Sequence, residues 1–101
     1  MATDSPQVIV TALFRSQPGR ENDTRTLLQS LVSTTRAEAG CIRYDLHEAT
    51  DQPGSFAFLE TWRSEPDLER HLASSHIRML RERLPALVAQ PPVVTVWRQI
   101  S

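Results

Sequence analysis

The chain alternates between short apolar runs and longer stretches of helical spacing. Four apolar runs rich in β-branched and aromatic residues predict strands, and they extend over Val8 to Phe14, Cys41 to His47, Phe56 to Trp62 and Val93 to Ile100. Between the first two runs, apolar residues recur with a helical period from about Glu21. This pattern predicts one surface helix that ends at Gly40, because glycine readily follows a helix C-terminus.

The segment after the third run begins with a clear helix signal. Ser64 can cap the first turn, Pro66 suits its first positions, and the neighbouring acids oppose the helix dipole. Ser74 and Ser75 interrupt the pattern and predict a second helix, which Pro85 should kink or shorten. The resulting order is typical of the ferredoxin-like split βαβ fold, an α+β class with a four-stranded antiparallel sheet and helices on one face.

The predicted strands are apolar on both of their faces. In the second strand, alternation places Ile42, Tyr44 and Leu46 on one face and Cys41 with Arg43 on the other. Helices cover only one face of such a sheet, so the other face needs a second cover. We therefore expect a homodimer stacked sheet against sheet, since two-fold symmetry is the commonest arrangement. We expect residues 8–101 to form one domain after a flexible N-terminus at 1–7.

Composition narrows the function classes. The formal net charge is −1 and the pI is near 6.3, which gives no argument for binding nucleic acid or a membrane surface. No apolar run is long enough to span a membrane, and the N-terminus lacks a signal-peptide pattern. The single cysteine, Cys41, excludes an intramolecular disulfide and fits a cytoplasmic protein.

Two histidines are the first candidates for chemistry, because histidine is the natural base near neutral pH. His76 follows the predicted helix break and is the leading candidate, with a helix-junction contact as the alternative. His71 comes second, because it shares a face with Leu68 and Leu72, where a core role is the alternative. The two lie five residues apart, not the four that align ligands on one helix face, and no third ligand is evident. We therefore expect no metal site.

Glu60 is the third candidate for chemistry. It lies between Phe58 and Trp62 on one face of a strand, which is not a solvent pattern. A buried carboxylate needs a partner. We expect Glu60 to accept a hydrogen bond from a histidine and orient its ring, or to pair with Arg43 or Arg81.

Four segments together resemble the antibiotic biosynthesis monooxygenase (ABM) domain family, and they are Gly40-Cys41-Ile42-Arg43-Tyr44, Phe58-Leu59-Glu60-Thr61-Trp62, His71-Leu72 and Ser75-His76-Ile77. The resemblance covers nearly the whole chain and implies a dimeric α/β barrel. Members of the family are similar in fold but differ in chemistry. Some oxidise quinols or hydroxyaromatic polyketide intermediates without a cofactor, some degrade haem, and some isomerise a small phosphorylated ketone.

The resemblance favours a cofactor-independent monooxygenase that oxidises a quinol or polycyclic hydroxyaromatic compound, with molecular oxygen as the only co-substrate. The hypothesis assigns proton abstraction to His76 and His71, orientation of the base to Glu60, and the ring slot to Trp62, Phe58 and Tyr44. One alternative is the ketone isomerase, with Arg43 and Arg81 holding phosphate. Another is a dimeric stress or binding protein without catalysis. Haem degradation fits less well, because the only asparagine, Asn22, begins the first predicted helix.

Overall fold

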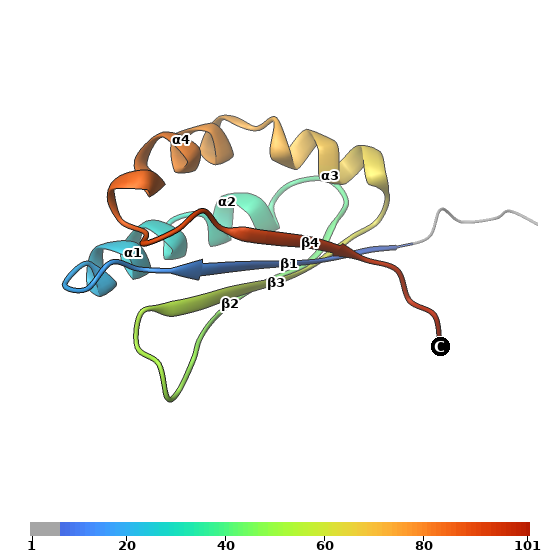
Figure 1. Cartoon of the computed structure of the whole chain (residues 1–101). Coiled ribbons are helices and arrows are strands. Elements are labelled where there is room, and N and C mark those ends of the chain that lie inside the picture. The colour runs from blue at the N-terminus through green and yellow to red at the C-terminus, as the bar shows by residue number, and fades with distance from the viewer. Residues whose placement is uncertain (1–6) are drawn as a thin grey trace, which may run out of the picture.

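The computed structural model describes residues 7–101, and the expected flexible segment 1–7 lies outside them apart from Gln7. One antiparallel sheet has the strand order β2-β3-β1-β4 (Figure 1). Its strands are β1 (Val8–Arg15), β2 (Cys41–Glu48), β3 (Ser55–Trp62) and β4 (Val93–Trp97). This arrangement confirms the predicted α+β, ferredoxin-like fold.

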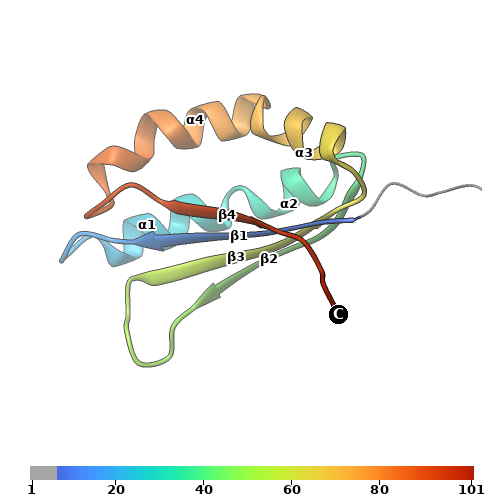
Figure 2. The same ribbon diagram turned by 45° about the vertical axis from the view of Figure 1, so that its right-hand side comes forward.

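All helices of the described chain lie on one side of this sheet (Figures 1 and 2). They are α1 (Glu21–Gln29), α2 (Val32–Arg36), α3 (Glu65–Leu72), α4 (Ser75–Arg83) and the 3-10 turn η1 (Leu84–Ala86). The predicted starts of α3 and α4 are confirmed. The Ser64 hydroxyl accepts the Asp67 backbone N–H, and the Ser74 hydroxyl accepts the Ile77 backbone N–H, so each helix has a side-chain cap.

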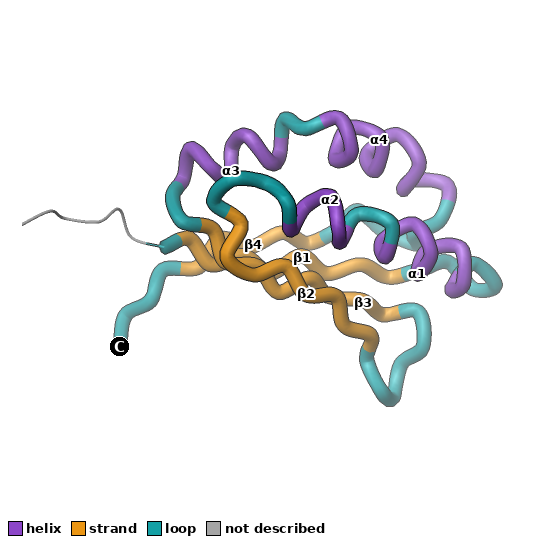
Figure 3. The backbone as a smooth tube through the Cα atoms, turned by 180° about the vertical axis from the view of Figure 1, so that it is seen from behind, coloured by secondary structure: helices purple, strands orange, loops and turns teal. Residues whose placement is uncertain are grey.

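The prediction of a single helix ending at Gly40 is wrong, because the chain bends between α1 and α2 (Figure 3). The Leu31 N–H bonds to the Leu28 carbonyl three residues back, and the Ser30 hydroxyl bonds to the Leu27 carbonyl. This tightened turn buries both Leu28 and Leu31 completely. The last strand is also shorter than predicted. It ends at Trp97, and Ile100 is exposed.

A β-bulge at Ile42 overturns the predicted alternation in β2. Cys41 pairs with Trp62, but Arg43 pairs with Thr61, so one residue between them has no partner across the ladder. Strand partners point to the same side of a sheet. Cys41 therefore turns toward the helices with Tyr44, where it packs against the core, and Ile42 is exposed.

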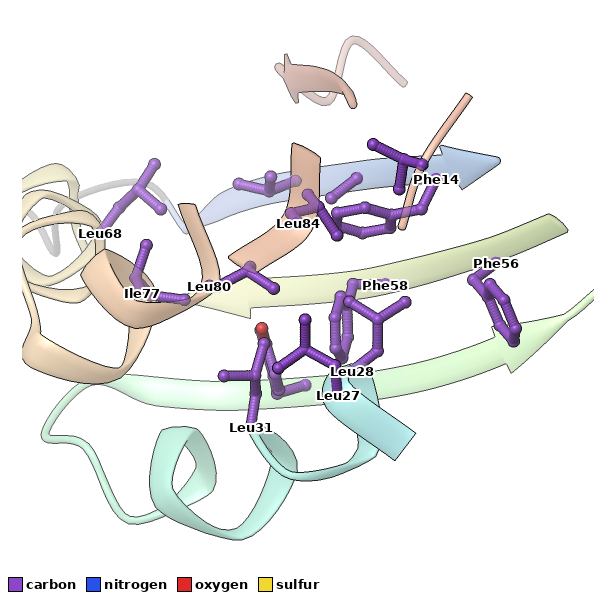
Figure 4. Packing of buried hydrophobic residues seen from close by; sticks show 14 of the residues in the cluster. Phe14, Leu27, Leu28, Leu31, Phe56, Phe58, Leu68, Ile77, Leu80 and Leu84 are labelled. Carbon is purple, nitrogen blue, oxygen red and sulfur yellow. The ribbon is translucent and has the colours of Figure 1, made fainter. Parts of the chain in front are cut away.

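The core fills the space between the helices and one face of the sheet. Figure 4 shows leucines from α1, α4 and η1 reaching toward Phe14 and Phe58. Phe58 and Trp62 on β3 are almost fully buried. Among the described residues, no helix has the length and apolar character needed to cross a bilayer.

The opposite face of the sheet has no cover from the described chain, and we call it the open face (Figure 2). It carries the residues that alternate with the buried ones, including Leu13, Val93 and Trp97, each about half exposed. The Trp97 indole N–H donates to the Thr11 hydroxyl at 2.8 Å, so this exposed side chain is held on the open face by a hydrogen bond to β1.

Candidate active site

A cavity of about 150 Å³, which we call the chamber, lies between the covered face of the sheet and the helices α3 and α4. Its apolar wall includes Val10, Ala12, Phe14, Phe58, Leu68 and Ile77. Two buried ionisable side chains, Glu60 and His71, also line it. A larger hollow of about 590 Å³ lies where β1, β2 and β3 meet the β2–β3 loop, but it contains neither of these groups. We therefore place the site at the chamber.

His71 is held in one orientation by Glu38, from the loop between α2 and β2. The His71 Nδ1 and Glu38 Oε2 atoms are 2.7 Å apart, and the His71 ring lies against Trp62 with 4.5 Å between ring centroids. Burial lowers the pKa of His71, so the ring is neutral at pH 7. A neutral ring that donates from Nδ1 keeps a lone pair on Nε2. This second nitrogen has no hydrogen-bond partner within residues 7–101, and His71 is among the residues that line the chamber.

His76 approaches the same carboxylate from the other side. It lies in the first turn of α4, and its Nε2 is 3.0 Å from Glu38 Oε2. The helix break at Ser74 lets His71 and His76 converge on one oxygen although they belong to different helices. Their side chains differ in exposure, with 3% for His71 and 16% for His76. His76 is therefore the more exposed of the two histidines, and it is not among the residues that line the chamber.

Glu60 is a buried acid without a cation. It accepts the Trp62 indole N–H at 2.9 Å, and the residues that the structure describes give it no ion pair. The expected contact with His71, His76, Arg43 or Arg81 is therefore wrong. Both histidines contact Glu38 instead. Glu60 bonds to Trp62, which lies two residues later on the same face of β3. Burial raises the pKa of Glu60 to about 7, so both protonation states are populated near neutral pH.

Two more groups of the covered face stay protonated at neutral pH. Burial raises the pKa of Tyr44 far above its usual range, and the ring of this residue stacks on Phe58 at 4.3 Å. Burial also raises the pKa of the Cys41 thiol to about 11, which fits an inert thiol. Tyr44 therefore contributes an aromatic wall to the chamber, and Cys41 contributes packing behind it.

The structure separates the two arginines that the sequence had grouped. Arg43 points to the open face, where its side chain forms an ion pair with Asp45 at 2.7 Å and is half exposed. Arg81 lies on α4 and lines the chamber, and it makes no ion pair with any described residue. Trp62 is fully buried behind His71 and is not part of the chamber lining. The chamber thus gathers His71, Glu60, Phe58, Tyr44 and Arg81.

Glu38 is the site residue that sequence reasoning missed. It lies two residues before Gly40, in a stretch where apolar residues do not recur at regular spacing. Such a stretch predicts a solvent-exposed acid. Gly40 is the residue in the sequence that could have indicated this contact. Its φ of +84° turns the chain sharply, and a Cβ there would collide with the buried Asp67 side chain of α3. This close approach brings the Glu38 loop against α3, where His71 lies.

Comparisons with known proteins show which family the chain is similar to. The family model described as antibiotic biosynthesis monooxygenase matches residues 7–83. The Mycobacterium tuberculosis protein named “Putative monooxygenase Rv0793” is 37% identical over 89 residues, which are 88% of this chain and 87% of that protein. A Synechocystis protein, sll1783, is 27% identical over 95 residues. The chain spans 94% of its own length in that match but only 64% of that relative's length.

Solved structures of two relatives superpose closely on this chain. PA3566 from Pseudomonas aeruginosa gives a TM-score of 0.91 at 29% identity, covering 99% of this chain and 100% of that one. The structure of Rv0793 gives a TM-score of 0.89 at 34% identity, covering 95% and 97%. The family model and these relatives extend over both sides of the chamber. The chain therefore belongs to the antibiotic biosynthesis monooxygenase family.

Proposed function

We propose that this protein is a cofactor-independent monooxygenase that oxidises a phenol or quinol with molecular oxygen. The observation that carries the proposal is the pairing of a small aromatic-walled chamber with a neutral, oriented imidazole. A deprotonated phenol is electron-rich enough to react with oxygen, so the protein's task is to hold the ring, remove its proton and exclude water. Family membership adds support, since relatives carry monooxygenase names.

His71 is the proton acceptor in this proposal, in place of His76. Glu38 accepts a hydrogen bond from the Nδ1–H group of His71. The lone pair of Nε2 then remains free to accept a proton from a substrate in the chamber that His71 lines. His76, which contacts the same carboxylate oxygen and is partly exposed, offers a route by which the proton reaches solvent. Glu60 is the second acid–base group, because its pKa of about 7 lets it give or take a proton at working pH.

The reaction balances without an added reductant. For a phenol, one oxygen atom of O2 bonds to the ring carbon para to the hydroxyl and becomes the second quinone carbonyl, and the other leaves as water with the hydrogens of that C–H bond and of the phenol O–H. For a quinol, whose para carbon already carries a hydroxyl, one oxygen atom becomes a hydroxyl group on another ring carbon that carried hydrogen, and the other leaves as water with the two quinol O–H hydrogens, so the product is a hydroxyquinone. The phenol supplies all of the electrons, which is why a bound cofactor is not required.

The chamber's size favours one aromatic ring inside it. A protein cavity of roughly 150 Å³ is known to hold benzene. Pro92, Val94 and Val96, at the β4 edge, border the chamber, and both valines are more than half exposed. A larger hydroxyaromatic compound would place its reacting ring inside and its remaining rings along this edge. Arg81 lies where it can meet an oxygen substituent of that outer part.

The rival isomerase has weaker support. A phosphorylated ketone needs a cluster of cations, and of the two candidate arginines only Arg81 borders the chamber, since Arg43 turns to the open face. A haem degrader would need polar ligands in the first strand, and Asn22 instead bonds to Arg25 within α1.

We further propose that two copies associate through their open faces, in a cytoplasmic dimer. Leu13, Val93 and Trp97 give this face an exposed apolar surface of the kind that marks interaction sites. A second copy is self-complementary to it by symmetry. The dimer would complete the barrel that the family resemblance implies.

Oxygen uptake by chelator-treated protein tests the proposal. The panel contains naphthols, naphthoquinols and hydroxyanthrones, and the variant is His71→Asn, which keeps a donor near Glu38 but loses the base. We expect uptake by the wild type and a loss of about 10²- to 10⁴-fold in the variant, the usual contribution of a general base. The matched control is His47→Gln, which changes an exposed histidine near the C-terminal end of β2 and should retain full uptake.

Ligand binding without any uptake would identify a binding protein and contradict the proposal. Uptake that is equal in wild type and His71→Asn would leave the chamber as the site but reject His71 as the base. Binding that needs a phosphate group on the ligand would favour the isomerase instead.

A further inference from the structure

Three potential metal ligands converge beside the chamber. Glu38 Oε2, His71 Nδ1 and His76 Nε2 all lie within 4.8 Å of one another. The carboxylate oxygen is 2.7 Å from the first nitrogen and 3.0 Å from the second. Sequence spacing had argued against a metal because the two histidines cannot share one helix face and a third ligand was missing. The helix break at Ser74 removes the first objection, and Glu38 removes the second.

The separations suit a divalent transition-metal ion after a small movement. Zinc binds nitrogen and carboxylate oxygen at roughly 2.0–2.1 Å, so tetrahedral ligand atoms lie about 3.3 Å apart. The two separations from the Glu38 oxygen, 2.7 and 3.0 Å, are shorter than this, and the two histidine nitrogens lie within 4.8 Å of each other. Glu38 can supply the movement, because it lies in the loop after α2 and its side chain is 17% exposed.

The surroundings also suit an ion with two positive charges. His71 and His76 each place a ring nitrogen at Glu38, and an imidazole nitrogen binds a metal ion through its lone pair. A second acid, Glu60, lines the chamber together with His71 and Arg81. The partial exposure of Glu38 and His76 gives an ion a way in and leaves space for water as a further ligand.

We propose that Glu38, His71 and His76 form a binding site for a divalent transition-metal ion of the zinc class, and that the bound ion inhibits the oxygenase. Two nitrogens and one carboxylate match the preferences of zinc, cobalt and iron(II) rather than magnesium or calcium. The ion joins three separate segments, namely the loop before β2, α3 and α4. It would therefore also stabilise the fold.

The inhibition follows from the tautomers of His71, and this part rests on the proposed function. Without the ion, Nδ1 carries the proton toward Glu38 and Nε2 keeps its lone pair for the substrate. Metal binding takes the lone pair of Nδ1, so the single ring proton must move to Nε2. Nε2 can then no longer accept the substrate proton. Ion binding and substrate deprotonation thus require opposite tautomers of the same ring.

Cobalt(II) titration of the chelator-treated, tag-free full chain tests the site. Cobalt held by nitrogen ligands absorbs visible light, and zinc should displace it. We expect Glu38→Gln and His76→Gln to lose at least the roughly 10- to 100-fold in affinity that even supporting residues contribute to metal sites. Both positions are partly exposed, so these variants should fold. Circular dichroism is the check that they do. His47→Gln and Glu69→Gln are the matched controls and should bind as the wild type does.

Thermal unfolding gives a readout independent of colour and activity. Zinc should raise the Tm of the wild type and both controls, because it binds only the folded site. It should not raise the Tm of Glu38→Gln or His76→Gln. Equal cobalt affinity in wild type and these two variants, or no binding in any of them, would overturn the metal site.

Oxygen uptake separates the two proposals. Zinc should abolish uptake by the wild type, and the residual uptake of His76→Gln should be insensitive to it. Cobalt binding without oxygen uptake under any condition would support the metal site and reject the proposed oxygenase. Uptake that appears only with added iron(II) would overturn both the inhibitory role and the cofactor-free reaction, while confirming the ligands.

Discussion

The two faces of the sheet are nearly equal in apolar character but opposite in use. On the covered face, Phe58 and Trp62 are buried and surround the ionisable groups Glu60 and His71. On the open face, Leu13 and its neighbours are about half exposed, and the charged side chains pair along the surface. The covered face therefore holds buried ionisable side chains among apolar ones. The open face presents an exposed apolar surface with charged side chains at its border.

This contrast shows how a protein can make a carboxyl group reactive without a metal or a neighbouring cation. Burial, with a smaller contribution from the charge of Glu38, raises the pKa of Glu60 to about 7, whereas Asp45 on the open face lies beside Arg43 and has a lowered pKa. The difference comes from the side of the sheet on which each acid lies. Substitutions on the two faces should accordingly have unequal consequences.

The largest difference is expected from removing one apolar side chain on each face. Phe58→Ala should lower the free energy of unfolding by about 3–5 kcal/mol, because it leaves a cavity in the core. Leu13→Ala should cost under about 1 kcal/mol for the isolated subunit, since the side chain is half exposed. Urea denaturation of dilute protein measures both. Equal losses would mean that the open face is as buried as the core under those conditions.

The next difference concerns Glu60 and pH. Its folded pKa lies above the unfolded value of 4.5, so the folded protein holds the proton more tightly. The contribution of Glu60 to stability is greatest below pH 4.5, falls as the pH rises to about 7, and is constant above that. The total loss is roughly 3 kcal/mol. Glu60→Gln keeps an acceptor for the Trp62 indole and should abolish this loss.

His71 contributes with the opposite sign in part of the same range. Its folded pKa is lowered, so the unfolded chain binds more protons and stability rises as the pH approaches 6.5. Both proteins contain His71, and the comparison of wild type with Glu60→Gln removes its effect. Unfolding curves at several pH values provide the measurement. A wild-type and variant difference that does not change with pH would contradict the raised pKa of Glu60.

A smaller effect should separate two glycines with the same backbone angle. Gly40 and Gly19 have φ of +84° and +85°, but a Cβ at Gly19 meets nothing within 4 Å, whereas one at Gly40 meets Asp67. We expect Gly19→Ala to cost about 1 kcal/mol, for strain alone. Gly40→Ala should cost about 2–3 kcal/mol, because a buried side chain must also move. Thermal unfolding compares them, and equal Tm values would deny the close approach of the Glu38 loop to α3.

The smallest effect on folding is expected where the effect on assembly is greatest. Val93→Arg places a charge on the open face, where half-exposed residues tolerate change, so the subunit's free energy of unfolding should shift by under about 1 kcal/mol. The proposed dimer should dissociate, because the arginines of two copies would face an apolar surface and each other. Light scattering coupled to gel filtration measures the mass. A wild type that is already monomeric would remove the dimer proposal.

The sequence predicted the elements better than their details. Runs of β-branched residues located all four strands, and Ser64 and Ser74 marked the starts of α3 and α4, because capping is a local property. The bulge at Ile42 and the bend at Ser30 could not be predicted in this way. Both depend on which apolar side chains the rest of the fold can bury, and that is a property of tertiary packing.

The site was predicted in part for the same reason. Residues that lie on one strand face or one helix face, such as Phe58, Glu60 and His71, were identified from spacing. Glu38 was missed because its partners are 33 and 38 residues away along the chain. A contact across that separation leaves no periodic signal. The wrong face predicted for Cys41 had a similar cause. A single unpaired residue in a strand moves the residues before it to the opposite face of the sheet.

The pairing of β1 with β4 has a consequence for how the chain could be rearranged. Ile9 lies opposite Trp97, so the described chain enters and leaves the sheet at the same end of neighbouring strands (Figure 1). A short linker could join these points, and the exposed residues 49–53 between β2 and β3, none of which lines the chamber, could supply new ends. The fold should therefore not depend on the order in which the elements follow one another along the chain. We expect a circularly permuted chain to form the same chamber.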